Sequence, residues 1–346
     1  MTFPHWGREG WATPRQGRLD APGILHHVIV RGINRGRLFV DEEDYLGFIA
    51  RLSRLVEATK TRIFAWALLP NHFHLLMQTG RVPIGRVMAR LLTGHAVTFN
   101  LRHRRSGKLY QNRFKSIICD EEEYLLELVR YIHLNPLRAG LVQGLEGLGR
   151  YPWCGHGVLM GRMEAPWQAT DQVLARFGER VARARKGYEA FVTEGIRVGH
   201  RPELAGGGLL RSVGGVVEYI RRRRQGEEML GDERILGDSG FVERVLKESE
   251  EWEDERSRKR RSLGVVGVIA WAAKHAGIDA GSVKGAGKVP AQCRARALAC
   301  YWLVDSLGLP EVAAARHLQI TQSAVSRSIA RGREIVVRER IKLADR

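Results

Sequence analysis

The chain has 346 residues, 44% of them hydrophobic, which suits two or three domains with sizeable cores and argues against wholesale disorder. The formal net charge of +18 favours a polyanionic partner such as nucleic acid, although a basic protein without one is the alternative. Four cysteines without a CxxC pair argue against a zinc ribbon or a disulfide framework and favour reduced thiols in a cytoplasm. No apolar run reaches the length of a membrane span.

The first segments of the chain predict a leader, a strand and a helix. Residues 1–22 lack the apolar core of a signal peptide and are expected to form a loose leader. Residues 24–32 are rich in β-branched side chains, which predicts a strand. Residues 41–60 open with acidic side chains and carry apolar ones at helical spacing, which predicts a helix. The apolar positions expected to face the core are Leu46, Ile49, Leu52 and Val56.

The next segments predict a hairpin, a helix, a strand and a further helix. A Pro-Asn pair at residues 70–71 suits the tight hairpin link. Asp120 and Glu123 form a capping-box pattern before the last helix, and Pro136 and Gly140 mark its end. The expected elements are strands 62–69 and 72–78, helix 84–103, strand 114–120 and helix 121–135.

The order β-α-β-β-α-β-α predicts a ferredoxin-like α+β layout with helices on an antiparallel sheet. Residues 23–161 are expected to form this domain. Residues 162–261 are expected to be a mostly helical middle region, whose polar end at 247–261 is an exposed helix or a linker. Its glycine-rich stretch at 206–215 is either a flexible turn or a loop that approaches phosphate. Residues 262–346 are expected to form a last, helical domain.

Two histidines stand one residue apart on the expected strand 72–78. His72 and His74 point to the same face because strand side chains alternate. Neutral imidazoles are common metal ligands, although ordinary strand histidines are the alternative interpretation.

A tyrosine and an asparagine share one face of the expected helix 121–135. Tyr131 and Asn135 are helix neighbours because they are four residues apart, and Tyr131 lies off the aliphatic stripe. Asn135 suits either a metal ligand or a helix C-cap. A divalent ion on two imidazoles and an amide oxygen keeps positions open for a phosphate, and a phenol oxygen can attack phosphorus. His133, a lysine or a metal-bound water could take the phenol proton.

Four ordered motifs, HVIVRGINR, LPNHFHLLMQ, YQNRFKSIICD and YIHLNPLRAGLV, resemble the HUH single-tyrosine transposase superfamily, and the last resembles its REP-associated branch. The resemblance covers residues 24–161. It implies that His72, His74 and Asn135 bind Mg²⁺ or Mn²⁺ and that Tyr131 is the nucleophile. It also implies cleavage of single-stranded hairpin DNA with a 5′-phosphotyrosine and a free 3′-OH. Asn135 stands where the insertion-sequence branch has glutamine.

Basic and aromatic side chains indicate where single-stranded DNA would lie. Residues 101–115 hold six basic residues, no acidic one, and two aromatic rings that suit stacking on unpaired bases; a solvated helix end is the alternative. His27 either approaches the site or packs as an ordinary strand histidine. The resemblance adds the turn after the first strand. The candidate DNA-binding residues here are Arg31, Asn34, Arg35, Arg102, Arg104, Arg105, Lys108, Arg113 and Lys115.

The C-terminal region resembles a helix-turn-helix. Residues 311–318 predict the first helix, Thr321 caps the second, and Gln319 replaces the glycine expected in the turn. A generic helical bundle is the alternative. The residues expected to face the major groove of duplex DNA are Gln322, Ser323, Ser326 and Arg327.

The sequence therefore predicts a metal-dependent, transposase-like enzyme that breaks single-stranded hairpin DNA and binds duplex DNA through its C-terminal domain. We expect no membrane association, a cytoplasmic location, and a monomer or homodimer. Two alternatives stay open. One is a transcriptional regulator with a catalytically silent HUH domain, and the other is a replication or mobilisation nickase.

Overall fold

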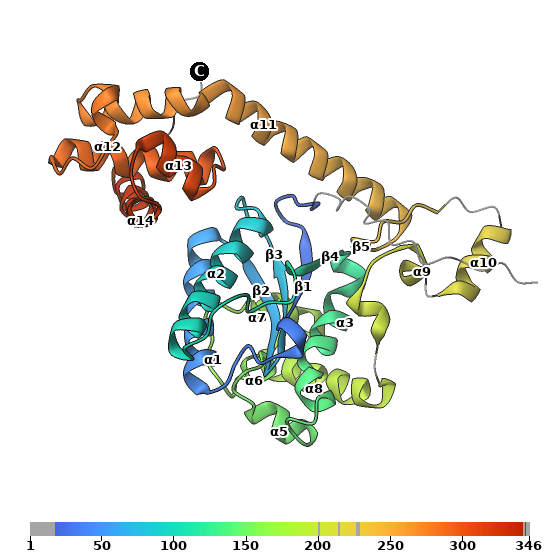
Figure 1. The fold of residues 1–346 in the computed structure, drawn as a ribbon. Helices are drawn as coiled ribbons and strands as arrows, with labels where there is room; N and C mark the ends of the chain where they lie inside the picture. Colours follow the sequence, from blue (N-terminus) through green and yellow to red (C-terminus); the bar gives the residue numbers. More distant parts are fainter. Residues whose placement is uncertain (1–17, 200, 214, 226–228, 342, 344–346) are drawn as a thin grey trace, which may run out of the picture. The chain divides into compact units, whose positions relative to one another are not determined.

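The structure is a computed structural model that describes residues 18–199, 201–213, 215–225, 229–341 and 343 (Figure 1). The chain divides into two compact units, Met1–Ser249 and Glu250–Arg346. Most of the expected leader lies outside the described residues. Within the described residues, no helix combines the length and the apolar character needed to cross a membrane.

A five-stranded sheet in the order β2-β3-β1-β4-β5 forms the centre of the first unit. The four longer strands pair antiparallel in the ferredoxin-like order, which confirms the predicted α+β layout. A short fifth strand pairs parallel with β4 and was not predicted, because two residues carry no periodic signal. The strands are β1 (Leu25–Arg31), β2 (Arg62–Leu69), β3 (His72–Gln78), β4 (Lys115–Cys119) and β5 (Ile235–Leu236).

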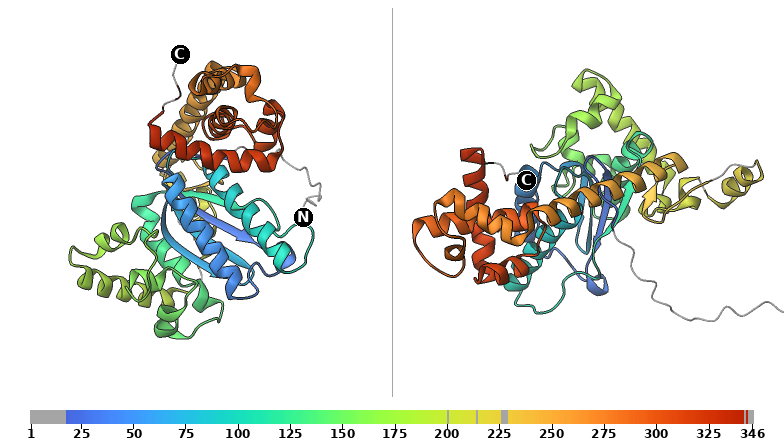
Figure 2. Two further views of the ribbon diagram at one scale, coloured as in Figure 1. Left: turned by 90° about the vertical axis from the view of Figure 1, so that its left-hand side faces the viewer. Right: turned by 90° about the horizontal axis from the view of Figure 1, so that it is seen from above.

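Helices cover both faces of this sheet (Figures 1 and 2). Two helices, α1 (Glu42–Thr59) and α2 (Ile84–Arg102), pack on the face that includes Leu75. One helix, α3 (Glu121–His133), packs on the opposite face beside Leu76. Because helices cover both faces of the sheet, side chains on both sides of the central strands are buried, and the sequences of these strands are almost continuously hydrophobic.

The core face of α1 differs from the predicted one at its start. Leu46 is 52% exposed, so its predicted core position is wrong. Tyr45 and Phe48 are buried in its place, because the ring of Tyr45 stacks on Phe39 with centroids 4.5 Å apart. The helix begins, as predicted, after an acidic N-cap, Asp41.

The start of α3 is capped differently from the prediction. The Asp120 carboxylate accepts from the backbone N–H of Glu122 at 3.0 Å, so Asp120 is the N-cap. Glu123 does not complete a capping box, because the backbone N–H of Asp120 donates to Leu236 of β5 at 3.0 Å. The unpredicted strand thus takes the donor that the capping box would have used.

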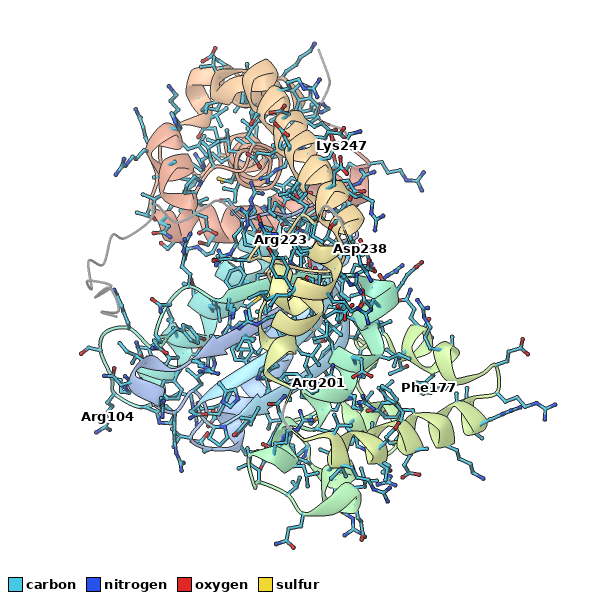
Figure 3. The ribbon with its side chains drawn as sticks, turned by 90° about the vertical axis from the view of Figure 1, so that its right-hand side faces the viewer. Arg104, Phe177, Arg201, Arg223, Asp238 and Lys247 are labelled. Atoms are coloured by element: carbon cyan, nitrogen blue, oxygen red, sulfur yellow. The ribbon has the colours of Figure 1, made fainter. Side chains whose placement is uncertain are left out.

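Residues after α3 form short helices and one long one. The long helix packs near α3, where the Arg130 guanidinium lies 4.0 Å from the Phe191 ring centroid. Figure 3 labels Phe177, whose ring centroid is 5.8 Å from that of Tyr188 on the long helix. The helices are α4 (Asn135–Arg138), α5 (Gly144–Arg150), α6 (His156–Leu159), α7 (Thr170–Leu174), α8 (Val181–Val198), α9 (Leu209–Ser212) and α10 (Val216–Arg224). Shorter turns are η1 (Ile33–Arg35), η2 (Ala175–Phe177) and η3 (Pro202–Ala205).

The second unit is helical and has its own core. Gly332 lets two of its helices approach closely, since a Cβ there would lie 2.1 Å from the Ala297 carbonyl oxygen. The two helices expected in the helix-turn-helix region form with the predicted N-termini, and Thr321 accepts from the Ala324 backbone N–H at 3.3 Å. The elements are α11 (Ser239–Ala276), which begins in the first unit, η4 (Ala280–Val283), α12 (Pro290–Tyr301), the π-helical turn η5 (Trp302–Ser306), α13 (Glu311–Leu318) and α14 (Gln322–Glu339).

Candidate active site

The pairing of β1 with β3 brings histidines to one face of the sheet. His72 pairs with Arg31 and His74 pairs with Ile29, and directly paired residues point to the same side. The ring centroids of His72 and His74 lie 5.3 Å apart, and His74 is 3% exposed. The structure therefore places the two expected ligands side by side beneath α3.

A chain of hydrogen bonds fixes the tautomer of His74. The Leu204 carbonyl oxygen lies 3.0 Å from Nδ1 of His27, and Nε2 of His27 lies 3.0 Å from Nδ1 of His74. A carbonyl can only accept, so we assign the His27 proton to Nδ1. Nε2 of His27 then accepts the Nδ1–H of His74, which leaves the lone pair of His74 on Nε2. His27 thus approaches the site, which was one of its two expected roles.

The second histidine is oriented in the same way. Nδ1 of His72 lies 2.7 Å from Oδ1 of Asn71, so we assign its proton there and its lone pair to Nε2. Burial, and secondly the charge of Arg31, lowers the pKa of His72 to about 4. Burial likewise lowers the pKa of His27 to about 4 and that of His74 well below its ordinary value. All three rings are therefore neutral near pH 7, which is the form that binds metals.

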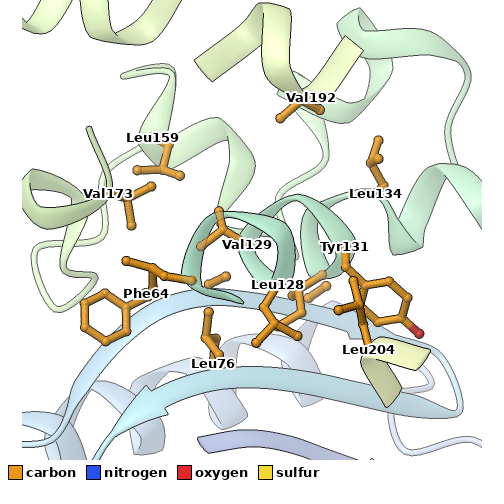
Figure 4. Packing of buried hydrophobic residues seen from close by; sticks show 14 of the residues in the cluster. Phe64, Leu76, Leu128, Val129, Tyr131, Leu134, Leu159, Val173, Val192 and Leu204 are labelled. Atoms are coloured by element: carbon orange, nitrogen blue, oxygen red, sulfur yellow. The ribbon is translucent and has the colours of Figure 1, made fainter. Parts of the chain in front are cut away.

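Tyr131 projects from α3 toward this cluster and is 5% exposed. Its ring centroid lies 5.9 Å from that of His74 and 5.9 Å from that of His27. Figure 4 shows its ring beside Leu204, in the same buried cluster. The guanidinium carbon of Arg138 lies 5.4 Å from the centroid of the Tyr131 ring. Sequence reasoning missed this cation, although its spacing of seven residues, two helical turns, was a signal that could have found it.

The side-chain amide nitrogen of Asn135 donates to the C-terminal end of α3, and its amide oxygen is not used in these hydrogen bonds. Its Nδ2 donates to the Tyr131 carbonyl at 2.9 Å and to the Ile132 carbonyl at 3.3 Å. Leu134 is the C-cap residue of α3 and Asn135 is the first residue of α4, but the Asn135 side chain satisfies two of the last carbonyls of α3. This contact does not exclude a ligand role, because the amide nitrogen makes these hydrogen bonds and Oδ1 is left to bind a cation.

His133 does not face Tyr131, so it is excluded as the group that takes the phenol proton. Residues two apart on a helix do not face each other, and His133 is fully buried on the other side. Its Nδ1 lies 2.7 Å from the hydroxyl of Tyr188, which also lies 2.9 Å from Nδ1 of His156.

The structure separates the basic residues of 101–115 into different environments. Arg102 forms ion pairs with Asp41, Glu43 and Asp44, so its charge is already balanced and we remove it from the expected DNA surface. Asp41, Asp44 and His103 also lie close enough together to hold a cation, but Arg102 already supplies the positive charge there.

Other residues of the expected single-strand surface remain accessible, whereas Phe114 does not. Phe114 is 7% exposed under Arg18, whose guanidinium carbon lies 3.6 Å from the ring centroid. Tyr110 is partly buried, and its hydroxyl is covered. The Phe114 ring is therefore not available to stack on bases. Figure 3 labels Arg104 on the loop before β4. The exposed basic and turn residues are Arg31, Asn34, Arg35, Arg104, Arg105, Lys108, Arg113 and Lys115.

In the second unit, all four of the expected groove-facing residues are exposed at the start of α14: Gln322, Ser323, Ser326 and Arg327. The Ser326 hydroxyl donates to the carboxylate of Glu311 and so ties α14 to α13. Gln319 adopts the left-handed conformation expected of the missing turn glycine, with φ 54°.

Part of the chain is similar to known proteins. Residues 21–135, about a third of the chain, match a family described as "Transposase IS200 like". This region is therefore similar to IS200-like transposases. A similar solved structure, "Structure of the REP associates tyrosine transposase bound to a REP hairpin", is 17% identical, covers 45% of this chain and 92% of that chain, and gives a TM-score of 0.37. No curated protein matches the chain.

Proposed function

We propose that the first unit cleaves and rejoins single-stranded, hairpin-forming DNA through Tyr131, with Mg²⁺ or Mn²⁺ bound by His72, His74 and Asn135. The observation that carries the proposal is the position of Tyr131 beside His74, 5.9 Å between ring centroids, in a region similar to IS200-like transposases. The assigned tautomers support it, because they leave both Nε2 lone pairs available.

The donor set fits a divalent ion. Two neutral imidazole nitrogens and one amide oxygen form an incomplete set, which leaves positions for phosphate oxygens. A bound ion would supply positive charge that stabilises the charge added to the phosphate during attack. His27 and Asn71 act as positioning residues, because each accepts the Nδ1–H of one ligand histidine.

Tyr131 would act as the nucleophile. Its phenol oxygen forms a bond to phosphorus while the bond from phosphorus to the 3′ oxygen of the DNA breaks, which gives a 5′-phosphotyrosine and a free 3′-OH. A phenol has an ordinary pKa of about 10, so the phenolate needs stabilisation near pH 7. The guanidinium of Arg138 beside the ring supplies positive charge for this purpose. A 3′-OH from another strand reverses the reaction and rejoins the DNA.

The test uses hairpin oligonucleotides from repeats near the gene, incubated with the full chain and Mg²⁺, Mn²⁺ or a chelator. We expect metal-dependent cleavage that His74→Ala abolishes and that the control His317→Ala, an exposed residue of α13, retains. Calorimetry with Mn²⁺ alone should show weaker binding for His74→Ala. Transfer of the cleaved strand to a second oligonucleotide distinguishes a strand transferase from a nickase. Hairpin binding without cleavage under either metal would contradict the proposal and favour the silent regulator.

We also propose that the second unit binds duplex DNA through α13 and α14. The supporting observation is a groove of about 960 Å³ beside the exposed start of α14. No acidic residue lines it, and such a surface suits phosphate groups and base edges. Its basic residues are Lys288, Arg296, Arg316, Arg327 and Arg331.

The duplex-binding proposal predicts a specific salt dependence. Arg327→Gln should weaken duplex binding roughly tenfold at low salt and reduce the salt slope by about one. Arg338→Gln, on α14 but outside the groove, is the control. Equal duplex binding by both variants would contradict a role for this groove.

A further inference from the structure

A cavity of the first unit, about 240 Å³ in volume, lies beside the candidate active site. The end of β1, the start of β4 and the segment before β4 line it, and Ala205 of η3 closes one side. Its lining residues are Ile29, Arg31, Gln111, Asn112, Arg113, Lys115 and Ala205.

The sheet register connects this cavity to the histidine pair. Ile29 pairs with His74 on one side and with Lys115 on the other, so these three lie in one row across the sheet. Two strand spacings, about 10 Å, separate β3 from β4. Arg31 pairs directly with His72, and its charge contributes to the lowered pKa of both His72 and His74. A strand of DNA that crosses the histidines can therefore continue into the cavity.

Positive charge in the cavity has no matching acid. Arg31, Arg113 and Lys115 bring three cations to its wall, and in the described part of the chain no carboxylate forms an ion pair with them. Lys115 donates to the Ala205 carbonyl at 2.7 Å, which is a neutral partner. Burial, then the charges of Arg211 and Arg31, lowers the pKa of Lys115. Cations gathered without a counterion repel one another, and a bound anion would relieve that repulsion.

The side chains also match the shape of a phosphate. Guanidinium groups bind phosphate oxygens through paired N–H donors, and lysine adds a compact charge. The side-chain amides of Gln111 and Asn112 add donors for the remaining oxygens. The apolar wall of Ile29 and Ala205 offers little to a base edge, so the cavity suits the backbone of DNA more than its sequence.

We propose that this cavity binds a backbone phosphate of the substrate strand, close to the phosphate that Tyr131 attacks, and so sets the register of the DNA on the active site. The inference rests on the proposed function, since it names a subsite for the same substrate. Arg113 is the positioning residue that tests it best. It is exposed and has no ion pair with the described residues, so removing its charge leaves the fold intact.

The experiment measures binding of a labelled hairpin oligonucleotide with a single-stranded flank, in the Tyr131→Phe background so that no cleavage intervenes. Each flank phosphate is replaced in turn by a neutral methylphosphonate. Arg113→Gln is compared with Arg54→Gln, an exposed arginine on α1 that does not line the cavity. We expect Arg113→Gln to lose about tenfold in affinity at low salt and to reduce the salt slope by about one, and Arg54→Gln to match the parent.

The decisive result is that the effect of the Arg113 substitution depends on one particular phosphate of the DNA flank. One methylphosphonate should weaken binding by the parent and by Arg54→Gln more than binding by Arg113→Gln, because in Arg113→Gln that phosphate has already lost one of its cationic partners. Equal sensitivity of all three proteins at every position, or no binding of any oligonucleotide, would overturn the subsite. A third outcome would also overturn the inference. If inorganic phosphate competes with DNA for binding to the parent, but no methylphosphonate position distinguishes Arg113→Gln from the parent, the cavity binds free phosphate and not a DNA phosphate.

Cleavage by the wild type is measured separately, so the two proposals fail in different ways. If Arg113 and one phosphate depend on each other for binding but the wild type does not cleave DNA, the phosphate subsite is supported and the proposed nuclease activity is rejected. Cleavage without this dependence supports the nuclease and rejects the subsite.

Discussion

The two units of the chain bury different kinds of side chain. The described part of the first unit buries six histidines: His26, His27, His74, His95, His133 and His156. In the described part of the second unit, Arg296 is the buried charged residue, and the rest of the core is aliphatic, alanine-rich or aromatic. The described part of the first unit therefore keeps several ionisable groups inside, of which His27 and His74 lie close to Tyr131, whereas the described part of the second unit buries Arg296 alone among its charged side chains.

This difference has a thermodynamic consequence. A buried imidazole loses its hydration, so the folded state favours its neutral form. The first unit holds neutral imidazoles in place, at the expense of stability in acid. The core of the second unit contains no histidine among the described residues, so it is less sensitive to acid.

Acid should distinguish the units most strongly. Burial lowers the pKa of His27, His72, His95 and His156 from 6.5 to about 4, so the unfolded chain takes up protons at a higher pH than the folded chain. Stability is complete above pH 6.5 and falls as the pH drops toward 4, by up to about 3 kcal/mol for each such group. Calorimetry of the full chain at pH 7 and pH 5 should show an earlier transition of the first unit. If the unfolding temperatures of both units fall equally between pH 7 and pH 5, the proposed difference in acid sensitivity is wrong.

Close helix packing should be the sensitive feature of the second unit. Gly332→Ala places a Cβ 2.1 Å from the Ala297 carbonyl oxygen and 2.8 Å from the Tyr301 Cβ, so α12 and α14 must separate. We expect a loss of about 3 kcal/mol in the second unit and none in the first. Gly267→Ala on α11 is the matched control. It meets no atom within 4 Å, so it should stabilise by about 1 kcal/mol. Denaturant unfolding measures both, and a neutral Gly332→Ala would reject the close packing.

The buried polar contacts of the first unit should make a similar substitution costly there. A Cβ at Gly155 would lie 2.7 Å from Oε1 of Gln168 and 2.9 Å from Nε1 of Trp66, two atoms that hydrogen-bond to each other at 2.8 Å. Gly155→Ala should therefore destabilise the first unit by about 2 kcal/mol. Gly47→Ala on α1 meets no atom and should stabilise it by about 1 kcal/mol. If thermal melts show that Gly155→Ala and Gly47→Ala change the stability of the first unit in the same direction, the tight packing around Gly155 is wrong.

The smallest effect concerns the turn between α13 and α14. Gln319 has φ 54°, a conformation that costs a non-glycine residue about 1 kcal/mol. Gln319→Gly should stabilise the second unit by less than about 1 kcal/mol, because glycine also gains freedom in the unfolded chain. Gln292→Gly, within α12, should destabilise it by about 1 kcal/mol. Destabilisation by Gln319→Gly would show that the turn differs from this description.

Local patterns in the sequence were sufficient to predict most helices and strands of the first domain and part of the candidate site. Strand alternation places His72 and His74 on one face, and helical spacing places Tyr131 and Asn135 on another. The contacts that orient these residues were not predictable in this way. Leu204 reaches His27 across 177 positions of sequence, and a two-residue strand replaces the capping box of α3.

Burial of particular rings also depended on tertiary packing. The ring of Phe114 lies in a basic segment whose composition resembles a DNA-binding surface, yet the fold covers it. Arg102 is basic in sequence but neutralised by three carboxylates that lie about sixty positions away. Composition alone therefore does not predict which side chains of such a segment are exposed and uncompensated.

The most direct test of the central claim is the covalent product. The full chain, incubated with cleavable hairpin DNA and Mn²⁺, is digested and its DNA-linked peptide identified by mass spectrometry. We predict a phosphate-linked adduct on Tyr131 that Tyr131→Phe abolishes and that Tyr124→Phe, on the same helix, retains. Cleavage that persists without an adduct in Tyr131→Phe, or an adduct on another residue, would contradict the account.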